Sequence, residues 1–302
     1  MRGPINAIKQ GLKPHLPYLA VLGLVTFLAG LPLFEFKLMR GHDSVPYFLR
    51  AIEFYEGLRF GNLFPRWAAD FAYGFGEPTF NFTPPVVLYF IAFFHVMGFG
   101  FISAENLAAF AILLLSGVGM YLLAGQAFGP RGGLVSAVAY LFSPYLLVNL
   151  YVRHALADFS AFAFIPFAFW GLHRYTAVGG YWRLLIGTFS TALLVLSSTS
   201  VALITFPALL LLFATMLFFE WRDRESSVIP ALARGLWLFI LALGLSAFYW
   251  LPSLAETDFV HLHRRLEGPA DFHNHFLYIH QLVFPQWGYG LSLPGSEDGM
   301  NF

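Results

Sequence analysis

Apolar residues are grouped in long runs along this chain, and short polar turns separate the runs. The first run, 16–36, follows the basic residues Arg2, Lys9 and Lys13. A helix needs about 20 apolar residues to span the hydrocarbon core of a bilayer. A secretory signal has an apolar region of only about 7 to 15 residues before a small-residue cleavage site, and this run has no such site. It therefore predicts a first span that is not cleaved.

Six further spans are expected between residues 104 and 251. They are predicted at 104–124, 132–150, 156–173, 183–198, 200–219 and 235–251. The apolar segment 85–101 differs from these, because it follows Pro84 and contains Gly98 and Gly100. A stretch this short and this rich in helix breakers favours a half-inserted helix over a full span.

The placement of arginines decides which way round the chain is inserted. If 85–101 does not cross, the opposite short loops hold only Arg153, and the short loops on the side of the N-terminus hold Arg131, Arg174, Arg183, Arg222, Arg224 and Arg234. If 85–101 crosses, these loops exchange sides, and the excess of arginines then lies on the side opposite the N-terminus. Positive residues collect in cytoplasmic loops. We therefore predict a multi-pass protein of the plasma (cytoplasmic) membrane with seven spans, one half-inserted helix and a cytoplasmic N-terminus.

Composition supports this class and excludes others. The chain is 58% hydrophobic and 11% charged, whereas soluble domains average about 45–50% and 25%. Its 17 Lys and Arg balance 17 Asp and Glu, so the basic excess of a nucleic-acid-binding protein is missing. The absence of cysteine leaves only His, Asp and Glu as metal ligands. We expect an all-α fold and a single membrane domain, 1–302.

Two long polar stretches, 37–84 and 252–302, are placed on the external face by this topology. The first opens with Gly41-His42-Asp43-Ser44, followed by apolar residues at helical spacing: Val45, Phe48, Leu49, Ile52 and Tyr55. This pattern predicts an amphipathic helix at the membrane surface, with Asp43 or Ser44 as its N-cap. A carboxylate there suits a base for an incoming hydroxyl or an anchor for a divalent cation. The alternative for Asp43 is a plain helix cap.

Other candidates lie further along the same loop. Arg66, in Phe64-Pro65-Arg66-Trp67, either binds a phosphate or pairs with Asp70. Glu77, in Tyr73-Gly74-Phe75-Gly76-Glu77-Pro78, is a further candidate for substrate contact. His42 is either a surface histidine or a ligand.

A second polar group, Arg153, His154 and Asp158, lies where one predicted span ends and the next begins. Ionisable residues near the apolar core are costly unless they are paired or wetted, so they usually face protein or a water-filled cavity. The group is either an interhelical salt bridge with a snorkelling arginine or part of a substrate site. The external turn at 197–200 either exposes its hydroxyls to the same cavity or is a simple turn.

The segment 252–302 holds five of the ten histidines: His261, His263, His273, His275 and His280. Their spacing matches no known zinc motif. Whether a divalent cation binds is therefore open, and the candidate ligands are His42, Asp43, His261 and His263. Arg264 is a candidate for contact with lipid phosphate.

The order of these parts resembles bacterial and archaeal multi-pass membrane proteins labelled 6-pyruvoyl-tetrahydropterin synthase-related. The shared features are Gly-His-Asp after the first span, the surface helix, Phe-Pro-Arg-Trp, Tyr-Gly-Phe-Gly-Glu-Pro, Phe-Asn-Phe-Thr-Pro-Pro and the late Trp-Gly-Tyr-Gly. The likeness covers essentially the whole chain. That group in turn looks like the GT-C glycosyltransferases, which move a sugar from a polyprenyl-phosphate carrier to an acceptor on the outer face.

The resemblance implies a GT-C-like fold and hexosyl or pentosyl transfer from a polyprenyl-phosphate sugar. It implies that Asp43 is the catalytic or metal-binding acid, and that Arg66, Arg153 or Arg264 holds the phosphate leaving group. The chain departs from the pattern in having no second acid beside Asp43, and Ser198-Thr199-Ser200 where relatives carry a histidine. Because GT-C proteins usually continue further, the resemblance also implies an N-terminal portion of a longer protein.

The alternative function is that of a non-catalytic membrane transporter, flippase or envelope-assembly scaffold. A transporter would be expected to place ionisable groups near the midplane and to be built from two similar halves. The predicted spans hold few such groups, and no similar halves are evident. The transferase hypothesis is therefore preferred.

Overall fold

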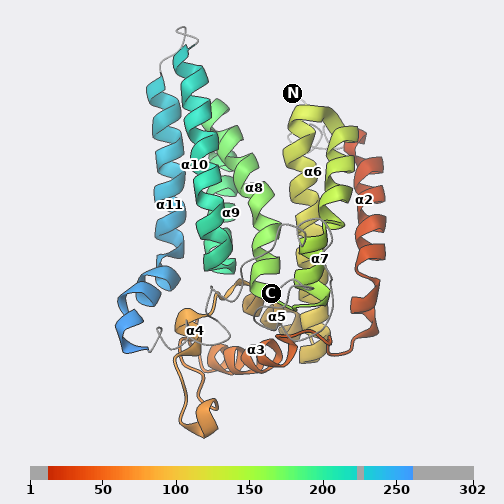
Figure 1. Ribbon diagram of the computed structural model, residues 1–302, viewed down its shortest axis with the longest axis vertical. Helices are drawn as coiled ribbons and strands as arrows, with labels where there is room; N and C mark the ends of the chain where they lie inside the picture. The colour runs from red at the N-terminus through yellow and green to blue at the C-terminus, as the bar shows by residue number, and fades with distance from the viewer. Residues whose placement is uncertain (1–12, 223–227, 261–302) are drawn as a thin grey trace, which may run out of the picture. The chain divides into compact units, whose positions relative to one another are not determined.

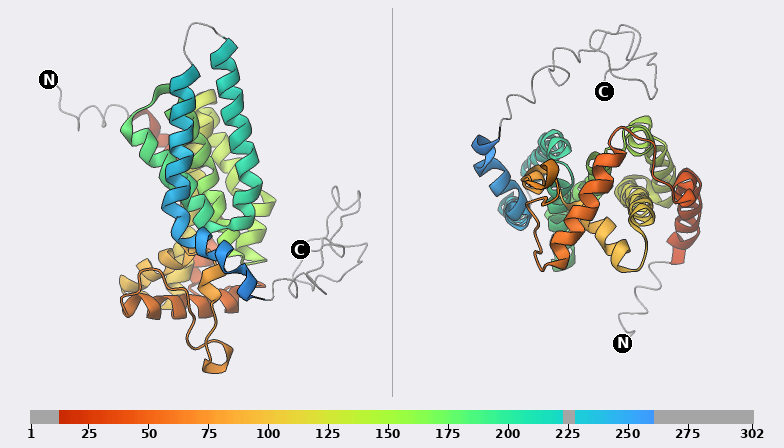
Figure 2. Two further views of the ribbon diagram at one scale, coloured as in Figure 1. Left: turned by 90° about the vertical axis from the view of Figure 1, so that its left-hand side faces the viewer. Right: turned by 90° about the horizontal axis from the view of Figure 1, so that it is seen from below.

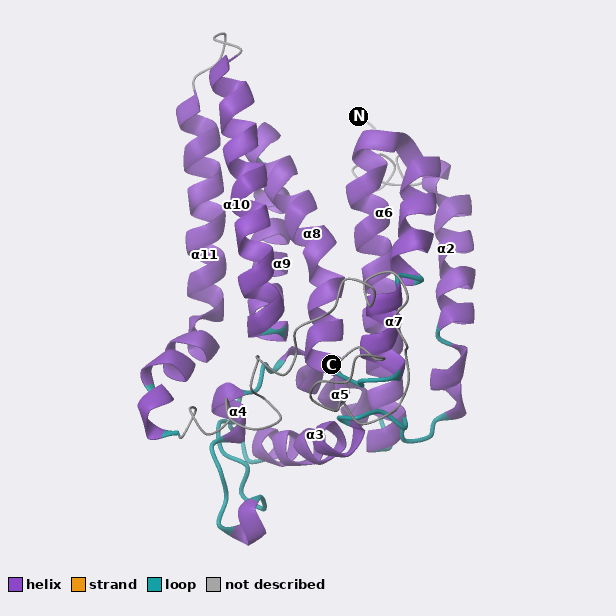
Figure 3. Ribbon diagram, viewed as in Figure 1, coloured by secondary structure: helices purple, strands orange, loops and turns teal. Residues whose placement is uncertain are grey.

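The computed structural model describes residues 13–222 and 228–260, and within these ranges it is helical, with no strand (Figure 3). One isolated antiparallel bridge joins Ala68 to Glu77. The prediction of an all-α fold is confirmed. The chain divides into two compact units, Met1–Trp250 and Leu251–Phe302. His261, His263 and Arg264 lie outside the described residues.

The long helices of the described part and the short α7 run alongside one another (Figure 1). They are α2 (Leu16–Ala29), α6 (Phe101–Leu141), α7 (Pro144–Tyr151), α8 (Leu156–Val178), α9 (Tyr181–Ser197), α10 (Thr199–Arg222) and α11 (Val228–Ala255). The shorter elements are η1 (Lys13–His15), η2 (Leu31–Glu35), α3 (Ser44–Arg59), η3 (Ala72–Gly74), α4 (Thr79–Phe82), α5 (Val86–Val96) and η4 (Thr257–Phe259). In Figure 2, α3 lies across one end of the bundle, which we call the α3 end.

In the part of the chain that the structure describes, four helices are long and apolar enough to cross a membrane: α6, α8, α10 and α11. α2, α5 and α9 are apolar but shorter. The outer face of α10 is apolar as well, since Leu203, Ile204 and Leu211 are 70%, 78% and 69% exposed. Large apolar surfaces of this kind are rare in water-soluble monomers, whereas a bilayer covers them. The structure therefore fits a membrane protein.

The first predicted span is shorter than expected. α2 ends at Ala29, and the chain continues through Gly30 into the 3-10 helix η2, which contains Pro32. Proline has no N–H for the helical ladder and clashes with the preceding turn, so an α-helix does not run on to residue 36.

α6 is two helices separated by a sharp turn. Gly129 has φ +68° and ψ −178°, and Pro130 follows it. That backbone conformation is open mainly to glycine, and proline at the next position starts a new helix well because its missing N–H would be unpaired there. The predicted spans 104–124 and 132–150 therefore correspond to the first part of α6 and to its second part continued by α7.

Two arginines of the predicted cytoplasmic loops, Arg183 and Arg234, lie at the C-terminal end of α8. Arg183 donates from Nη1 to the carbonyl of Gly179 at 2.9 Å, and Arg234 donates from Nη1 to the carbonyl of Thr176 at 3.0 Å. Both arginines thereby satisfy carbonyls at the C-terminus of α8, where the helix dipole favours positive charge. Arg153 comes just before the other end of the same helix.

α5 packs at the α3 end. Its Tyr89 hydroxyl donates to the carbonyl of Leu63 at 2.6 Å, and the Tyr89 ring meets Phe54 of α3 edge-on at 4.9 Å. An 11-residue helix rises about 16 Å, roughly half of the 30 Å hydrocarbon core. α5 by itself is therefore too short to cross a bilayer.

α8 and α9 approach each other closely through two glycines. A Cβ added to Gly171 would lie 2.4 Å from the Cα of Gly187, far inside van der Waals contact. Small residues at such crossings let helix backbones pack tightly in membranes, where the hydrophobic effect does not hold helices together.

Gly171→Ala is therefore expected to destabilise the bundle by about 1–3 kcal/mol, the usual cost of overpacking. The measurement is the apparent melting temperature in detergent. Gly125→Ala is the matched control, because Gly125 is also helical and a Cβ there meets nothing within 4 Å. Equal melting temperatures for the two variants would contradict the tight crossing.

Candidate functional site

The turn Gly41–Ser44 is hydrogen-bonded to the corner between α7 and α8. The His42 N–H donates to the Val152 carbonyl at 3.2 Å, and the Asp43 N–H donates to the Arg153 carbonyl at 3.0 Å. These backbone bonds join two segments that are remote in sequence. Asp43 and Arg153 consequently meet at the α3 end of the bundle.

Tyr47, one turn into α3, strengthens the same attachment. Its hydroxyl accepts a hydrogen bond from the Ala157 N–H at 3.0 Å. Burial raises the pKa of Tyr47 to about 12, although the bond from Ala157 acts in the opposite direction. The hydroxyl is therefore neutral at physiological pH, and it acts as a fixed acceptor that ties α3 to the start of α8.

α3 forms where the sequence predicts a helix, but another face is buried. The buried residues are Ser44, Tyr47, Ala51 and Phe54. Val45 and Leu49 of the predicted apolar stripe are 56% and 45% exposed. Packing against the bundle selects the face with Tyr47 and Phe54, which leaves the predicted stripe partly outward, as a helix at a membrane surface requires.

Asp43 is the N-cap of α3, as predicted, but its side chain makes no capping hydrogen bond. The Ser44 hydroxyl instead accepts from the Gly41 N–H at 2.8 Å and so closes the turn. Asp43 is exposed. Helix capping by a side chain normally satisfies a free N–H of the first turn, so capping does not account for an aspartate here.

Arg153 lies among polar partners. Its Nη1 donates to Asn149 Oδ1 at 2.7 Å and lies 3.4 Å from the Tyr145 hydroxyl and 3.7 Å from Asp158 Oδ2. The Arg153 and Asp158 side chains are 26% and 23% exposed. The ion pair that the sequence analysis considers is thus present, and water still reaches both groups.

The serine turn reaches this pair. Ser198 Oγ donates to Asp158 Oδ1 at 2.7 Å and accepts from the Val201 N–H at 3.2 Å. Asp158 is therefore held from two sides, by Arg153 and by Ser198. Asp43, Arg153, Asp158 and Ser198 come from three separate parts of the chain, and we call them the turn site.

His154 does not face the turn site. Its side chain is 1% exposed, and Nε2 lies 2.8 Å from Oε1 of Glu105, which is 3% exposed. The prediction that His154 contacts substrate stays a prediction, and in the structure its side chain makes an internal contact. Glu105 is absent from the sequence-based candidates, although a single acid inside the apolar run 104–124 is a signal of a functional or paired residue.

Arg66 and Glu77 lie in the loop between α3 and α4. Arg66 donates to Asn81 Oδ1 from Nε at 2.9 Å and from Nη2 at 2.6 Å. Asn81 is thus a partner of Arg66 that the sequence did not predict. Glu77 is exposed, and its carboxylate accepts from the Thr79 hydroxyl. Neither residue belongs to the turn site.

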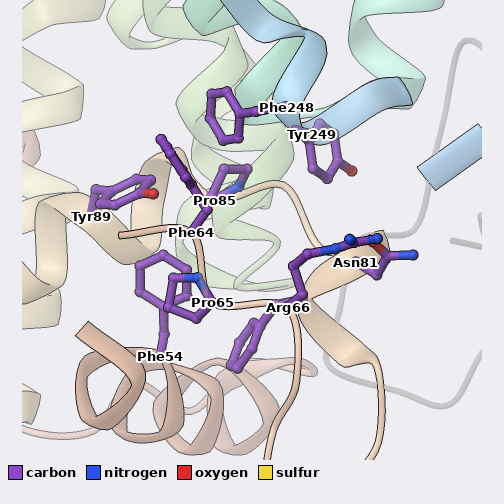
Figure 4. Close-up of a pocket in the computed structure, with 10 residues that line it drawn as sticks. Phe54, Phe64, Pro65, Arg66, Asn81, Pro85, Tyr89, Phe248 and Tyr249 are labelled. Atoms are coloured by element: carbon purple, nitrogen blue, oxygen red, sulfur yellow. The ribbon is translucent and has the colours of Figure 1, made fainter. Parts of the chain in front are cut away.

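A pocket with aromatic walls adjoins the Arg66–Asn81 pair (Figure 4). Its lining also contains Pro65, Pro85 and the rings of Phe54, Phe64, Phe80, Tyr89, Phe248 and Tyr249. One hydroxyl of the pocket lies near the serine turn. Tyr249 lies 3.2 Å from Thr199 Oγ1, and the neighbouring residue Ser198 bonds Asp158.

Within residues 13–222 and 228–260, no group of three His, Asp or Glu side chains is arranged to hold a metal ion. Asp43 and His42 are both exposed at the turn. The predicted candidates His261 and His263 lie outside this part of the chain. The expectation of a divalent cation stays a prediction.

The fold and the turn site together define a helical protein suited to a membrane, with a charged polar site at one end of its bundle. No family model matches the chain. It is similar to a Lactococcus lactis subsp. cremoris (strain MG1363) protein described as an uncharacterized protein, with 24% identity over 254 residues. The match covers 81% of this chain and 41% of that relative, so the chain spans less than half of the relative's length.

Proposed function

We propose that this chain is the membrane part of a GT-C-like glycosyltransferase with seven spans and one half-inserted helix. It transfers a sugar from a polyprenyl-phosphate donor to an acceptor on the extracytoplasmic face of the plasma membrane, and its N-terminus is cytoplasmic. The observation that carries the proposal is the docking of the Asp43 turn onto Arg153 through two backbone hydrogen bonds. Sugar transfer from a phosphate needs an acid group and a cation at one place, and this docking brings the backbones of Asp43 and Arg153 together.

In this proposal Asp43 acts as general base or as the anchor of a divalent cation. As a base, its carboxylate takes the proton of the acceptor hydroxyl while the hydroxyl oxygen forms a bond to the anomeric carbon. The bond from that carbon to the phosphate oxygen breaks, and its electron pair leaves with the phosphate. The exposure of Asp43 and the absence of a capping bond suit a carboxylate that meets an incoming substrate.

Arg153 stabilises the charge that develops on the phosphate. A guanidinium binds phosphate oxygens through charge-assisted hydrogen bonds, and fixed donors of this kind lower the barrier most when they are oriented in advance. Asn149 and Asp158 orient Arg153, and Ser198 orients Asp158. The donor approaches from the side on which this pair remains partly exposed.

The aromatic surface around Arg66 is proposed to lie against the lipid part of the donor. Its walls are rings and prolines, and the guanidinium of Arg66 lies beside them. Arg66 is therefore the second candidate for phosphate contact. Membrane lipid and the polyprenyl chain are the partners proposed for this end of the molecule, and nucleic acid is not.

The test is transfer of label in membranes that contain the chain. Membranes with and without it are incubated with polyprenyl-phosphate hexose and polyprenyl-phosphate pentose, each labelled in the sugar. Label is expected to move to a membrane-bound acceptor only where the chain is present. Movement of the donor across vesicle bilayers without transfer would support the flippase alternative instead. If no donor gives either transfer or movement, the proposal is overturned.

A further inference from the structure

Glu105 and His154 form a pair buried inside the bundle, next to the turn site. Their residues are 2% and 1% exposed, and Glu105 Oε1 lies 2.8 Å from His154 Nε2. The other carboxyl oxygen, Oε2, is buried and has no hydrogen-bond partner. Enclosing a carboxyl group away from water is costly even when it is paired. Burial of Glu105 therefore calls for a reason beyond stability.

The geometry requires a proton between the two side chains. His154 Nδ1 lies 3.3 Å from the Leu150 carbonyl; a carbonyl only accepts, so this contact is a hydrogen bond in the tautomer with a proton on Nδ1. The short contact between Nε2 and Oε1 then needs a second proton, on either atom. The pair is neutral overall in both arrangements, but removing one partner leaves the other buried without its hydrogen bond.

The backbone at His154 is held in a conformation that side chains rarely adopt. Its φ is +54°, a left-handed value that is unfavourable for a residue with a Cβ. Such conformations persist only where the surroundings determine them. The bond to Glu105, a residue of α6, holds the ring of His154 against that helix. It is thus one of the contacts that fix the corner between α7 and α8.

The anchored corner in turn determines where the Asp43 turn lies. The carbonyls of Val152 and Arg153, directly before His154, accept the two N–H groups of the turn. Gly41 lies so close that an added Cβ would be 2.3 Å from the Cβ of His154. The turn therefore rests directly on the residue that Glu105 fixes.

We propose that Glu105 and His154 are positioning residues: they set the place of the Gly41–Asp43 turn against the α7–α8 corner and so the place of the Asp43 carboxylate relative to Arg153. The effect on the turn follows from the geometry alone. The effect on transfer rests on the proposed function.

The absence of cysteine makes the positioning measurable with two introduced labels. Val45→Cys on α3 and Phe142→Cys before α7, at positions 56% and 48% exposed, carry nitroxide labels on the full chain in lipid nanodiscs. The parent is expected to give one narrow distance distribution. Glu105→Ala and His154→Ala are expected to broaden or shift it, and the double variant is expected to do so no more than either single one, because both lose the same contact.

Two further variants separate positioning from general damage. Glu105→Gln keeps the shape and can donate from its amide to His154 Nε2, so its distribution is expected to match the parent. Ser116→Ala also removes a buried polar group from α6, but the Ser116 hydroxyl bonds the Ile112 carbonyl of its own helix; the distribution is expected not to change. If Glu105→Ala does not fold, Glu105→Asp retracts the carboxylate from His154 and is expected to shift the distribution.

The same variants are then compared in the transfer assay. Glu105→Ala is expected to lower kcat about 10- to 100-fold with the KM for donor changed less than about threefold, since misplacing a reacting group by about 1 Å has effects of this size. Glu105→Gln is expected to restore kcat. A distribution that stays narrow in both Glu105→Ala and Glu105→Asp would overturn the positioning proposal. If the variants broaden the distribution but the parent chain itself transfers no sugar, the positioning proposal stands and the proposed function is overturned.

Discussion

Asp43→Asn is expected to lower sugar transfer by at least about 100-fold, while the donor still binds. Asparagine has nearly the same shape, but its amide cannot take a proton or neutralise a cation, and general base catalysis contributes about 10²- to 10⁴-fold. The side chain makes no capping bond, so the helix is expected to keep its start. The measurement is the initial rate of label transfer at saturating donor, with size-exclusion behaviour as the test of folding.

The matched control is Glu56→Gln, an acid on the same helix. Glu56 pairs with Arg59 at 3.1 Å, and the two side chains are 42% and 62% exposed. Exposed pairs of this kind contribute little, so the rate is expected to stay within about twofold of the parent. Asp43→Asn at the parental rate would remove Asp43 from the mechanism and leave Arg153 without an acid partner in catalysis.

Gly41→Ala is expected to lower transfer about 30- to 100-fold without unfolding the bundle. The new Cβ would meet two atoms of His154, its Cβ at 2.3 Å and its backbone N at 3.1 Å. Neither atom is at the end of a flexible side chain, so the turn itself has to move by about 1 Å. A displacement of that size at the reacting group reduces the rate about 100-fold.

The control for this variant is Gly23→Ala in α2, where an added Cβ meets nothing within 4 Å. Alanine stabilises a helix interior by about 0.5–1 kcal/mol relative to glycine, so its melting temperature is expected to be equal to or above that of the parent. Full activity of Gly41→Ala would mean that the turn can shift without affecting transfer. The docking of the turn would then not be needed for catalysis.

Some features of the fold follow from local sequence alone. Each predicted apolar run corresponds to helix, since an amphipathic or apolar stretch of this length has few other ways to satisfy its backbone in lipid. The turn before α3 and the break of α6 at Gly129 are also local. The first is closed by the bond from the Gly41 N–H to the Ser44 hydroxyl, and the second depends on a φ that glycine tolerates best. The arginine count predicts an orientation in the membrane, and that orientation stays a prediction.

Other features depend on residues that only the folded chain brings together. The sequence placed Asp43 and Arg153 on one face, but their distance depends on backbone bonds between residues about 110 positions apart. The partner of His154 is Glu105, 49 residues earlier, and the partner of Asp158 is Ser198, 40 residues later. Periodicity describes which side of one helix is apolar and says nothing about which helix it meets.

The sequence by itself determined the helical elements and their fit to a membrane, because hydrophobic length and helix breakers act within a few residues. It also named candidate side chains such as Asp43, Arg153 and Asp158. The tertiary structure decided which of those side chains meet. It buried His154, paired Arg66 with Asn81 and turned the face of Tyr47 and Phe54 inward, since these outcomes depend on packing between remote segments.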